Sequence, residues 1–152
     1  MVAPRTVSRK QVQAEPFVVW NEYVNILAMS EYDELTETQR FAHLSFWYDS
    51  ELQNGGHLQY FENHGVHRVE EIVRSLQRLG GAAQAEVLSR AAHKFRSKQR
   101  TKIDTADEFV QTALEGEFDE LDGDYYRCHP AMEELLKTYL RQHRDDFVVI
   151  VE

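Results

Sequence analysis

A polar and aromatic segment around two adjacent glycines constrains this chain more than any other part of its sequence. It runs from residue 50 to residue 63 and contains Asn54-Gly55-Gly56 near its middle. Glycine tolerates positive φ angles that residues with a Cβ atom avoid. We therefore expect one helix to end at Asn54 and a second helix to begin after Gly56 at a sharp angle.

Polar side chains crowd both sides of this glycine pair. We interpret them as a buried polar cluster that joins the two helices, in preference to a catalytic or ligand site. In this interpretation the Glu51 carboxylate accepts backbone N–H groups at the start of the helix after Gly56, where the helix dipole favours an anion. The residues assigned to this structural motif are Glu51, Asn54, Gly55, Gly56, Gln59, Tyr60, Phe61 and Asn63.

A chemical alternative uses the histidines in and after the same segment. It is a metal-dependent or hydrolytic enzyme built around Glu51, His57, His64 and His67. The chain has no His-Glu-x-x-His or Cys-x-x-Cys pattern, no glycine-rich phosphate loop and no dinucleotide fingerprint. We therefore expect no catalytic residues, no metal and no cofactor, and the enzyme stays the second choice.

The glycine segment also carries a family resemblance. The pattern Glu-x-x-Asn-Gly-Gly-x-x-Gln-Tyr-Phe-x-Asn over residues 51–63 resembles a bacterial family of helical domains of unknown function. Residues 118–126 and 139–147 look like the same family, so the resemblance spans roughly residues 20–147. The family includes a dimeric DNA mimic that captures a transcription factor. The resemblance implies an all-helical fold and an acidic surface, but a fold does not fix an activity. We also expect the chain to form a homodimer.

Length and cysteine usage agree with an ordinary globular domain. A chain of 152 residues can bury a substantial core as one domain. Its single cysteine, Cys128, excludes an intrachain disulfide framework and favours a reducing compartment. No apolar stretch of signal-peptide or membrane-spanning length is present. We expect a cytoplasmic protein with no membrane contact.

Hydrophobic periodicity predicts a single all-α domain of about seven helices over residues 15–152. Residues 1–14 are basic and are expected to form a flexible arm, and Phe147–Val151 a short extended tail without an obvious partner. Thr36 with Gln39, and Thr105 with Glu108, match helix-capping patterns. The helix from Thr105 should bury Phe109, Val110, Ala113 and Leu114. The predicted helices cover residues 16–30, 36–54, 57–63, 66–79, 82–95 and 105–115, and a last one starts at Pro130.

Charge is segregated along the chain. The net charge is −9, yet residues 68–102 hold nine basic and three acidic residues. Residues 15–67 and 103–152 are strongly acidic. The densest acidic cluster is predicted to bind a partner and consists of Glu115, Glu117, Asp119, Glu120, Asp122 and Asp124. Closely spaced, outward carboxylates on a rigid frame can imitate the phosphates of DNA and attract a basic groove.

The basic stretch between these acidic parts runs from Arg90 to Lys102. We expect it to pair with acidic groups of the same or a second subunit and not to bind nucleic acid directly. The predicted function is therefore an acidic protein-binding module, and its specific form is a DNA mimic that sequesters a basic nucleic-acid-binding protein. Besides the enzyme, the remaining alternative is a structural scaffold or a toxin-neutralising, immunity-type protein.

Overall fold

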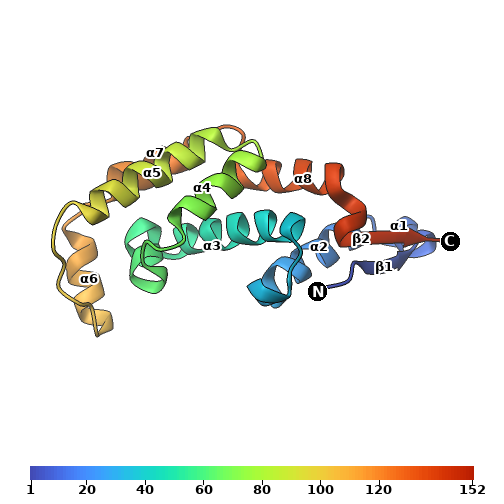
Figure 1. Cartoon of the computed structure of the whole chain (residues 1–152), viewed down its shortest axis with the longest axis horizontal. Coiled ribbons are helices and arrows are strands. Elements are labelled where there is room, and N and C mark those ends of the chain that lie inside the picture. Colours follow the sequence, from blue (N-terminus) through green and yellow to red (C-terminus); the bar gives the residue numbers. More distant parts are fainter.

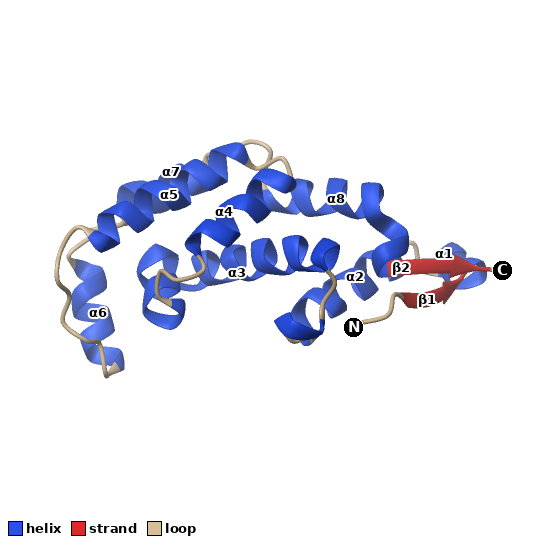
Figure 2. Ribbon diagram, in the orientation of Figure 1, coloured by secondary structure: helices blue, strands red, loops and turns tan.

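The protein forms an elongated helical body with its two terminal strands side by side at one tip (Figure 1). The computed structural model describes all residues from 1 to 152. It contains eight α-helices, one 3₁₀ turn and a two-stranded sheet (Figure 2), so the all-α prediction is confirmed for the body. In chain order the elements are β1 (Arg5–Ser8), α1 (Arg9–Ala14), α2 (Val18–Met29), η1 (Tyr32–Glu34), α3 (Glu37–His64), α4 (Val69–Arg78), α5 (Ala82–Arg96), α6 (Ala106–Leu114), α7 (Asp119–Tyr126), α8 (Met132–Phe147) and β2 (Val148–Val151).

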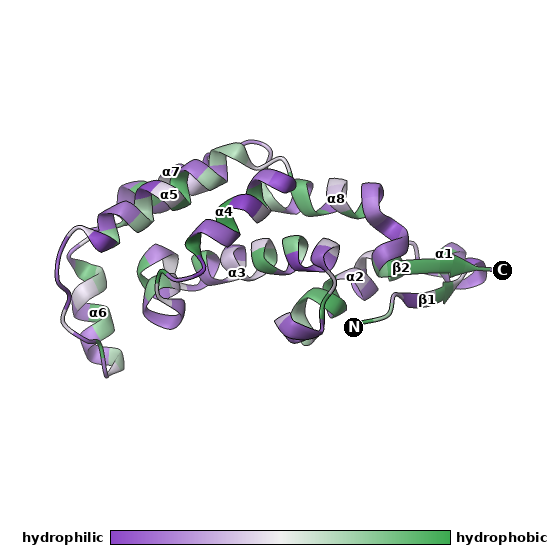
Figure 3. Cartoon of the chain, viewed as in Figure 1, coloured by the Kyte–Doolittle hydropathy of each residue, from purple (hydrophilic) through white to green (hydrophobic).

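A continuous hydrophobic core runs along α3, the longest helix, and most other helices pack one face into it. Apolar and polar residues alternate along these helices with helical spacing (Figure 3). Large side chains such as Tyr23, Leu27 and Leu88 are fully buried there. Burying a leucine or an aromatic ring of this kind stabilises the fold by about 1.5–3 kcal/mol relative to an exposed side chain. No helix is both long enough and apolar enough to cross a membrane.

The capping pattern at Thr36 is confirmed and has a second role. The Thr36 hydroxyl accepts the Gln39 N–H, and the Gln39 side chain accepts the Thr36 N–H at 3.0 Å. The buried Gln39 amide also donates to the carbonyl oxygens of Val2 and Asp146. The start of α3 therefore holds both ends of the chain.

The chain termini were predicted to be a flexible arm and an unpaired tail, but in the structure they pair with each other. Strand β1 lies parallel to β2 in register from Arg5 opposite Val148 to Ser8 opposite Val151. Val7 and Val148 are buried between the sheet and the body. Residues 1–14 thus contribute a strand and a short helix where an arm was expected. The tail finds a partner that is more than 140 residues away in the sequence.

Three helix predictions need correction. Helix α6 stands apart at the other tip of the molecule (Figure 1), so Val110 and Leu114 are 51% and 75% exposed instead of buried. The acidic segment after Phe118 forms α7, which periodicity alone did not reveal. Pro130 was expected to begin the last helix, but α8 begins at Met132. By contrast, the two helices predicted on either side of Asn54-Gly55-Gly56 are confirmed as the two segments of α3, which meet at a kink at Gly55 and Gly56.

Candidate functional site

The glycine pair sits at a sharp bend inside α3. Gly56 has φ 71° and ψ −167°, a backbone region that is essentially reserved for glycine. The bend ends the first helical segment of α3 and starts the second at His57. The predicted change of direction at Asn54-Gly55-Gly56 is therefore confirmed.

Asp122 of α7, not Glu51, supplies the anion at the start of the second segment. Its Oδ1 accepts the backbone N–H of His57 at 2.9 Å and the His57 ring Nδ1–H at 2.7 Å. The other ring nitrogen of His57 accepts the Tyr48 hydroxyl at 2.7 Å. His57 is fully buried. This Asp122–His57–Tyr48 chain satisfies every polar atom of the imidazole and fastens α7 to the bend in α3.

Two tyrosines of α7 make the same connection to the first half of α3. The Tyr125 hydroxyl donates to the Asp49 carboxylate, and the Tyr126 hydroxyl donates to the Leu52 carbonyl. Burial raises the pKa of the Tyr125 hydroxyl, and the nearby charge of Asp49 raises it further. Tyr125 therefore remains a proton donor at physiological pH, and α7 is held to α3 from Asp122 to its last residue.

Glu51, on the first segment of α3, is bound by a separate group of side chains from the second segment. Its carboxylate accepts hydrogen bonds from the side-chain amides of Gln59 and Asn63 at 2.9 and 3.0 Å. His64 Nε2 lies 3.2 Å from the other oxygen. Burial alone would raise the pKa of Glu51, but the hydrogen bonds from these residues outweigh it and lower that pKa. Glu51 is therefore ionised at neutral pH.

The remaining motif residues fall on both sides of this cluster. Tyr60 and Phe61 point into the core, where they are 3% and 2% exposed. Asn54 is exposed at the bend. The structure thus brings Glu51, Gln59 and Asn63 together, while Asn54 lies apart from them.

The histidines of the alternative enzyme site do not converge. His57 is bound to Asp122 and Tyr48, whereas Glu51 contacts only His64 of the three histidines. His67 lines the same pocket as Glu51 and His64 without a hydrogen bond to either. No group of three or more His, Cys, Asp or Glu side chains is arranged to hold a metal ion.

The six predicted partner-binding acids divide into two sets. Three are used within the chain: Glu117 binds Arg100 at 2.6 Å, Asp124 binds Arg90 at 3.3 Å, and Asp122 binds His57. The other three, Glu115, Asp119 and Glu120, are exposed and form no ion pair. Three of the six predicted partner-binding acids therefore remain as unpaired, outward carboxylates.

The basic stretch pairs within the same chain, as expected. Arg100 makes two hydrogen bonds with Glu117 and stacks over the Phe95 ring at 4.3 Å. Its neighbours find acidic or carbonyl partners as well: Arg90 with Asp124, Lys94 with the Glu117 carbonyl, Arg96 with Glu70, Lys98 with Glu117, and Lys102 with Asp104. Few of these cations remain available for a phosphate backbone.

A second group of unpaired acids was not singled out from the sequence. Glu31, Asp33, Glu34 and Glu37 surround η1 and are exposed without an ion pair. The sequence signal was the near absence of bases from residues 15–67, where Arg40 is the only one. Arg40 instead donates to the backbone carbonyls of Tyr32 and Asp33.

Acid should weaken the Glu117–Arg100 pair in a defined pH window. The Arg100 hydrogen bonds lower the pKa of Glu117 below its ordinary value of 4.5. A carboxylate with a depressed folded-state pKa contributes stability that is present above its unfolded pKa and lost as pH falls through the folded one. Below about pH 4.5, chemical denaturation should show Glu117→Gln losing less stability than wild type per pH unit. Parallel stability–pH curves for the two proteins would contradict this assignment.

Comparison with known families assigns the chain to one of them. Residues 33–143 match the family model described as DMP19-like protein. The match covers most of the chain, from η1 to the last turns of α8, so the chain belongs to the DMP19-like family. Neither the curated proteins nor the solved structures contain a match.

Proposed function

We propose that this member of the DMP19-like family binds a basic protein through the carboxylates at the α6–α7 junction. By doing so it occupies the surface on which that partner binds nucleic acid. The observation that supports this proposal most strongly is the division of the acidic cluster. Glu115, Asp119 and Glu120 carry uncompensated exposed charge, while the neighbouring acids Glu117 and Asp122 fix the start of α7 to the body.

The internal pairs make the frame for the outward charges. Glu117 is held by Arg100 just before α7, and Asp122 is held by the buried His57 one turn into it. Asp119 and Glu120 lie between these two anchors, in the first turn of α7. Duplex DNA presents about one negative charge per 1.7 Å of axis, so a mimic needs closely spaced carboxylates in fixed positions. Pre-organised charges also lose less conformational entropy on binding.

Apolar surface beside these charges adds a second kind of contact. Val110 and Leu114 of α6 are exposed immediately before Glu115 in the chain. Protein interfaces combine an apolar centre with a polar rim, and both elements are present at this tip. The charged surface of a DNA duplex offers no comparable apolar area for these side chains to contact. The combination therefore favours a partner that is a protein, with direct nucleic-acid binding disfavoured by the paired basic stretch.

A displacement experiment tests the proposal. Basic proteins from the organism that encodes this chain are bound to a duplex-DNA column at about 0.1 M salt, where exposed charges act over about 10 Å. Wild-type protein should release a specific basic protein from the column. The variant Glu115→Gln/Asp119→Asn/Glu120→Gln should need at least tenfold more protein for the same release, because the charges that compete with DNA phosphates are gone.

The matched control removes three exposed charges elsewhere. Glu133→Gln/Glu134→Gln/Asp145→Asn changes the net charge equally, but its residues lie on α8. It should release the partner as well as wild type does. Equal loss of release in both variants would show that only overall charge matters, and no release by wild type would reject the proposed function.

A further inference from the structure

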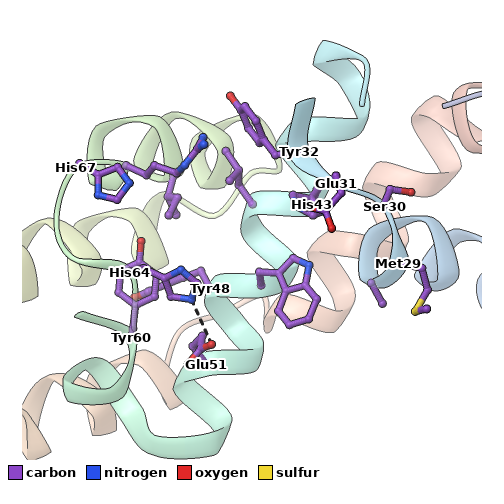
Figure 4. A pocket seen from close by; sticks show the side chains of 15 residues that line it. Met29, Ser30, Glu31, Tyr32, His43, Tyr48, Glu51, Tyr60, His64 and His67 are labelled. Atoms are coloured by element: carbon purple, nitrogen blue, oxygen red, sulfur yellow. Dashed lines mark hydrogen bonds and ion pairs between the residues drawn. The ribbon is translucent and has the colours of Figure 1, made fainter. Parts of the chain in front are cut away.

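A pocket lies between α2, α3 and α4. None of its lining residues belongs to the α6–α7 junction. Its volume is about 410 Å³, which lies in the range of small-ligand sites. Figure 4 shows Glu51 and His64 at one end and Tyr32 at the opposite end. Trp47, Tyr48 and Tyr60 also line it, so aromatic rings form much of the wall.

The carboxylate of Glu51 lacks a permanent positive partner. Its side chain is only 15% exposed, yet its hydrogen bonds come from the neutral amides of Gln59 and Asn63 and from His64. His64 carries a positive charge only when it is protonated, and its ring is 45% exposed. A largely buried, ionised carboxylate is normally balanced by a cation. This one opens onto a cavity instead.

The other charged groups around the pocket leave this position negative. Arg68 forms an ion pair with Glu71 at 3.2 Å, and its guanidinium carbon lies 4.0 Å from the centre of the Tyr32 ring. Burial lowers the pKa of His43, which therefore adds no positive charge at neutral pH. Glu31 adds a second carboxylate to the lining, which also includes His67 and the phenols of Tyr32, Tyr48 and Tyr60. Aromatic rings near a carboxylate form a favourable environment for an organic cation.

We propose that this pocket binds a small organic cation, a protonated amine or a guanidinium on an apolar body, with Glu51 as its counter-ion. The aromatic walls contact the apolar body and the face of the cationic group. Arg68 remains paired with Glu71 and stays away from the cation. The cation completes the charge balance that the protein alone leaves open at Glu51.

Fluorescence of Trp47 can test this assignment. The chain has two tryptophans, and Trp20 packs against Tyr23 away from the pocket lining, so Trp20→Phe leaves Trp47 as the only reporter. Titration with 2-phenylethylammonium chloride should change the Trp47 emission saturably. The neutral isostere 2-phenylethanol should bind at least tenfold more weakly, because it cannot pair with the carboxylate. Equal affinity for the two compounds, or no saturable change with the amine, would overturn the proposal.

The variant Glu51→Gln provides the matching loss on the protein side. In the Trp20→Phe background it should weaken amine binding at least tenfold and leave binding of the alcohol unchanged. Thermal melts establish whether the Glu51→Gln variant is folded. The comparison of amine and alcohol in protein that retains Glu51 does not depend on that variant. Retention of amine affinity by folded Glu51→Gln would contradict the role of Glu51.

The same chemistry can come from a free amine or from a side chain of a bound protein. N-acetylarginine amide is therefore titrated beside 2-phenylethylammonium. Tighter binding of the arginine compound assigns the site to a partner's side chain, and tighter binding of the amine assigns it to a free metabolite. Glu51 lies outside the α6–α7 tip, so Glu51→Gln should still release the basic partner from DNA. Failure of this inference is therefore distinguishable from failure of the proposed function.

Discussion

Replacing Gly56 with alanine should lower the free energy of unfolding by about 4 kcal/mol. The backbone at Gly56 adopts φ 71° and ψ −167°, and holding a residue with a Cβ there costs about 1–3 kcal/mol. The added Cβ would also press against the Asp122 carboxylate more closely than real Cβ contacts allow. Asp122 would then have to leave His57, which forfeits the hydrogen bonds that fasten α7 to α3. Both penalties arise from one methyl group.

Thermal and chemical denaturation measure this effect against a matched glycine. Gly123 lies inside α7, where an added Cβ meets only the end of the flexible, exposed Arg127 side chain. Gly123→Ala should therefore change stability by less than about 1 kcal/mol, in the stabilising direction. Gly56→Ala should lower the melting temperature by roughly 10 °C for a domain of this size. Similar melting temperatures for the two variants would show that the bend does not require glycine.

Replacing Asp122 with alanine should cost about 3 kcal/mol. The substitution leaves the buried His57 with two unpaired N–H donors, one on the backbone and one on the ring. Each buried donor without a partner costs about 1–3 kcal/mol. The loss should also loosen α7, so hydrogen exchange of the α7 amides should become faster than in wild type.

Asp119→Ala is the control for this substitution. Asp119 lies one turn earlier in the same helix but is exposed and forms no ion pair. Its removal should cost no more than about 1 kcal/mol, the usual contribution of a charge near a helix N-terminus. If the two alanine variants unfold at the same denaturant concentration, Asp122 does not anchor α7 in the way described.

Local signals were sufficient for the parts of the fold that depend on local chemistry. The bend at Gly55-Gly56 and the cap at Thr36 follow from residues within a few positions of each other, and both were predicted. Parallel pairing of the two chain ends was not predictable, because neither strand's sequence indicates its partner and the two strands are far apart in the chain. The exposure of α6 was missed for a related reason. An amphipathic pattern predicts a helix with an apolar face but does not provide the surface that covers it.

The site shows the same limit more sharply. Glu51 was close enough in sequence to serve as the anion at the bend, yet Asp122 takes that role from 65 positions away. Counting carboxylates likewise overestimated the free charge, because Arg90 and Arg100 reach across from α5 and the segment after it to neutralise Asp124 and Glu117. The composition of the acidic cluster was visible in the sequence. Its division into anchors and outward charges depended on tertiary contacts.

Salt dependence of association with the displaced partner is the most direct measurement of the central claim. Stopped-flow mixing at ionic strengths from about 0.05 to 0.5 M spans Debye lengths of roughly 14 to 4 Å. Over this range the association rate constant of wild type should fall at least tenfold, since exposed carboxylates steer the encounter. The variant lacking the charges of Glu115, Asp119 and Glu120 should associate slowly throughout. A wild-type rate constant that does not change with salt would contradict binding through these carboxylates.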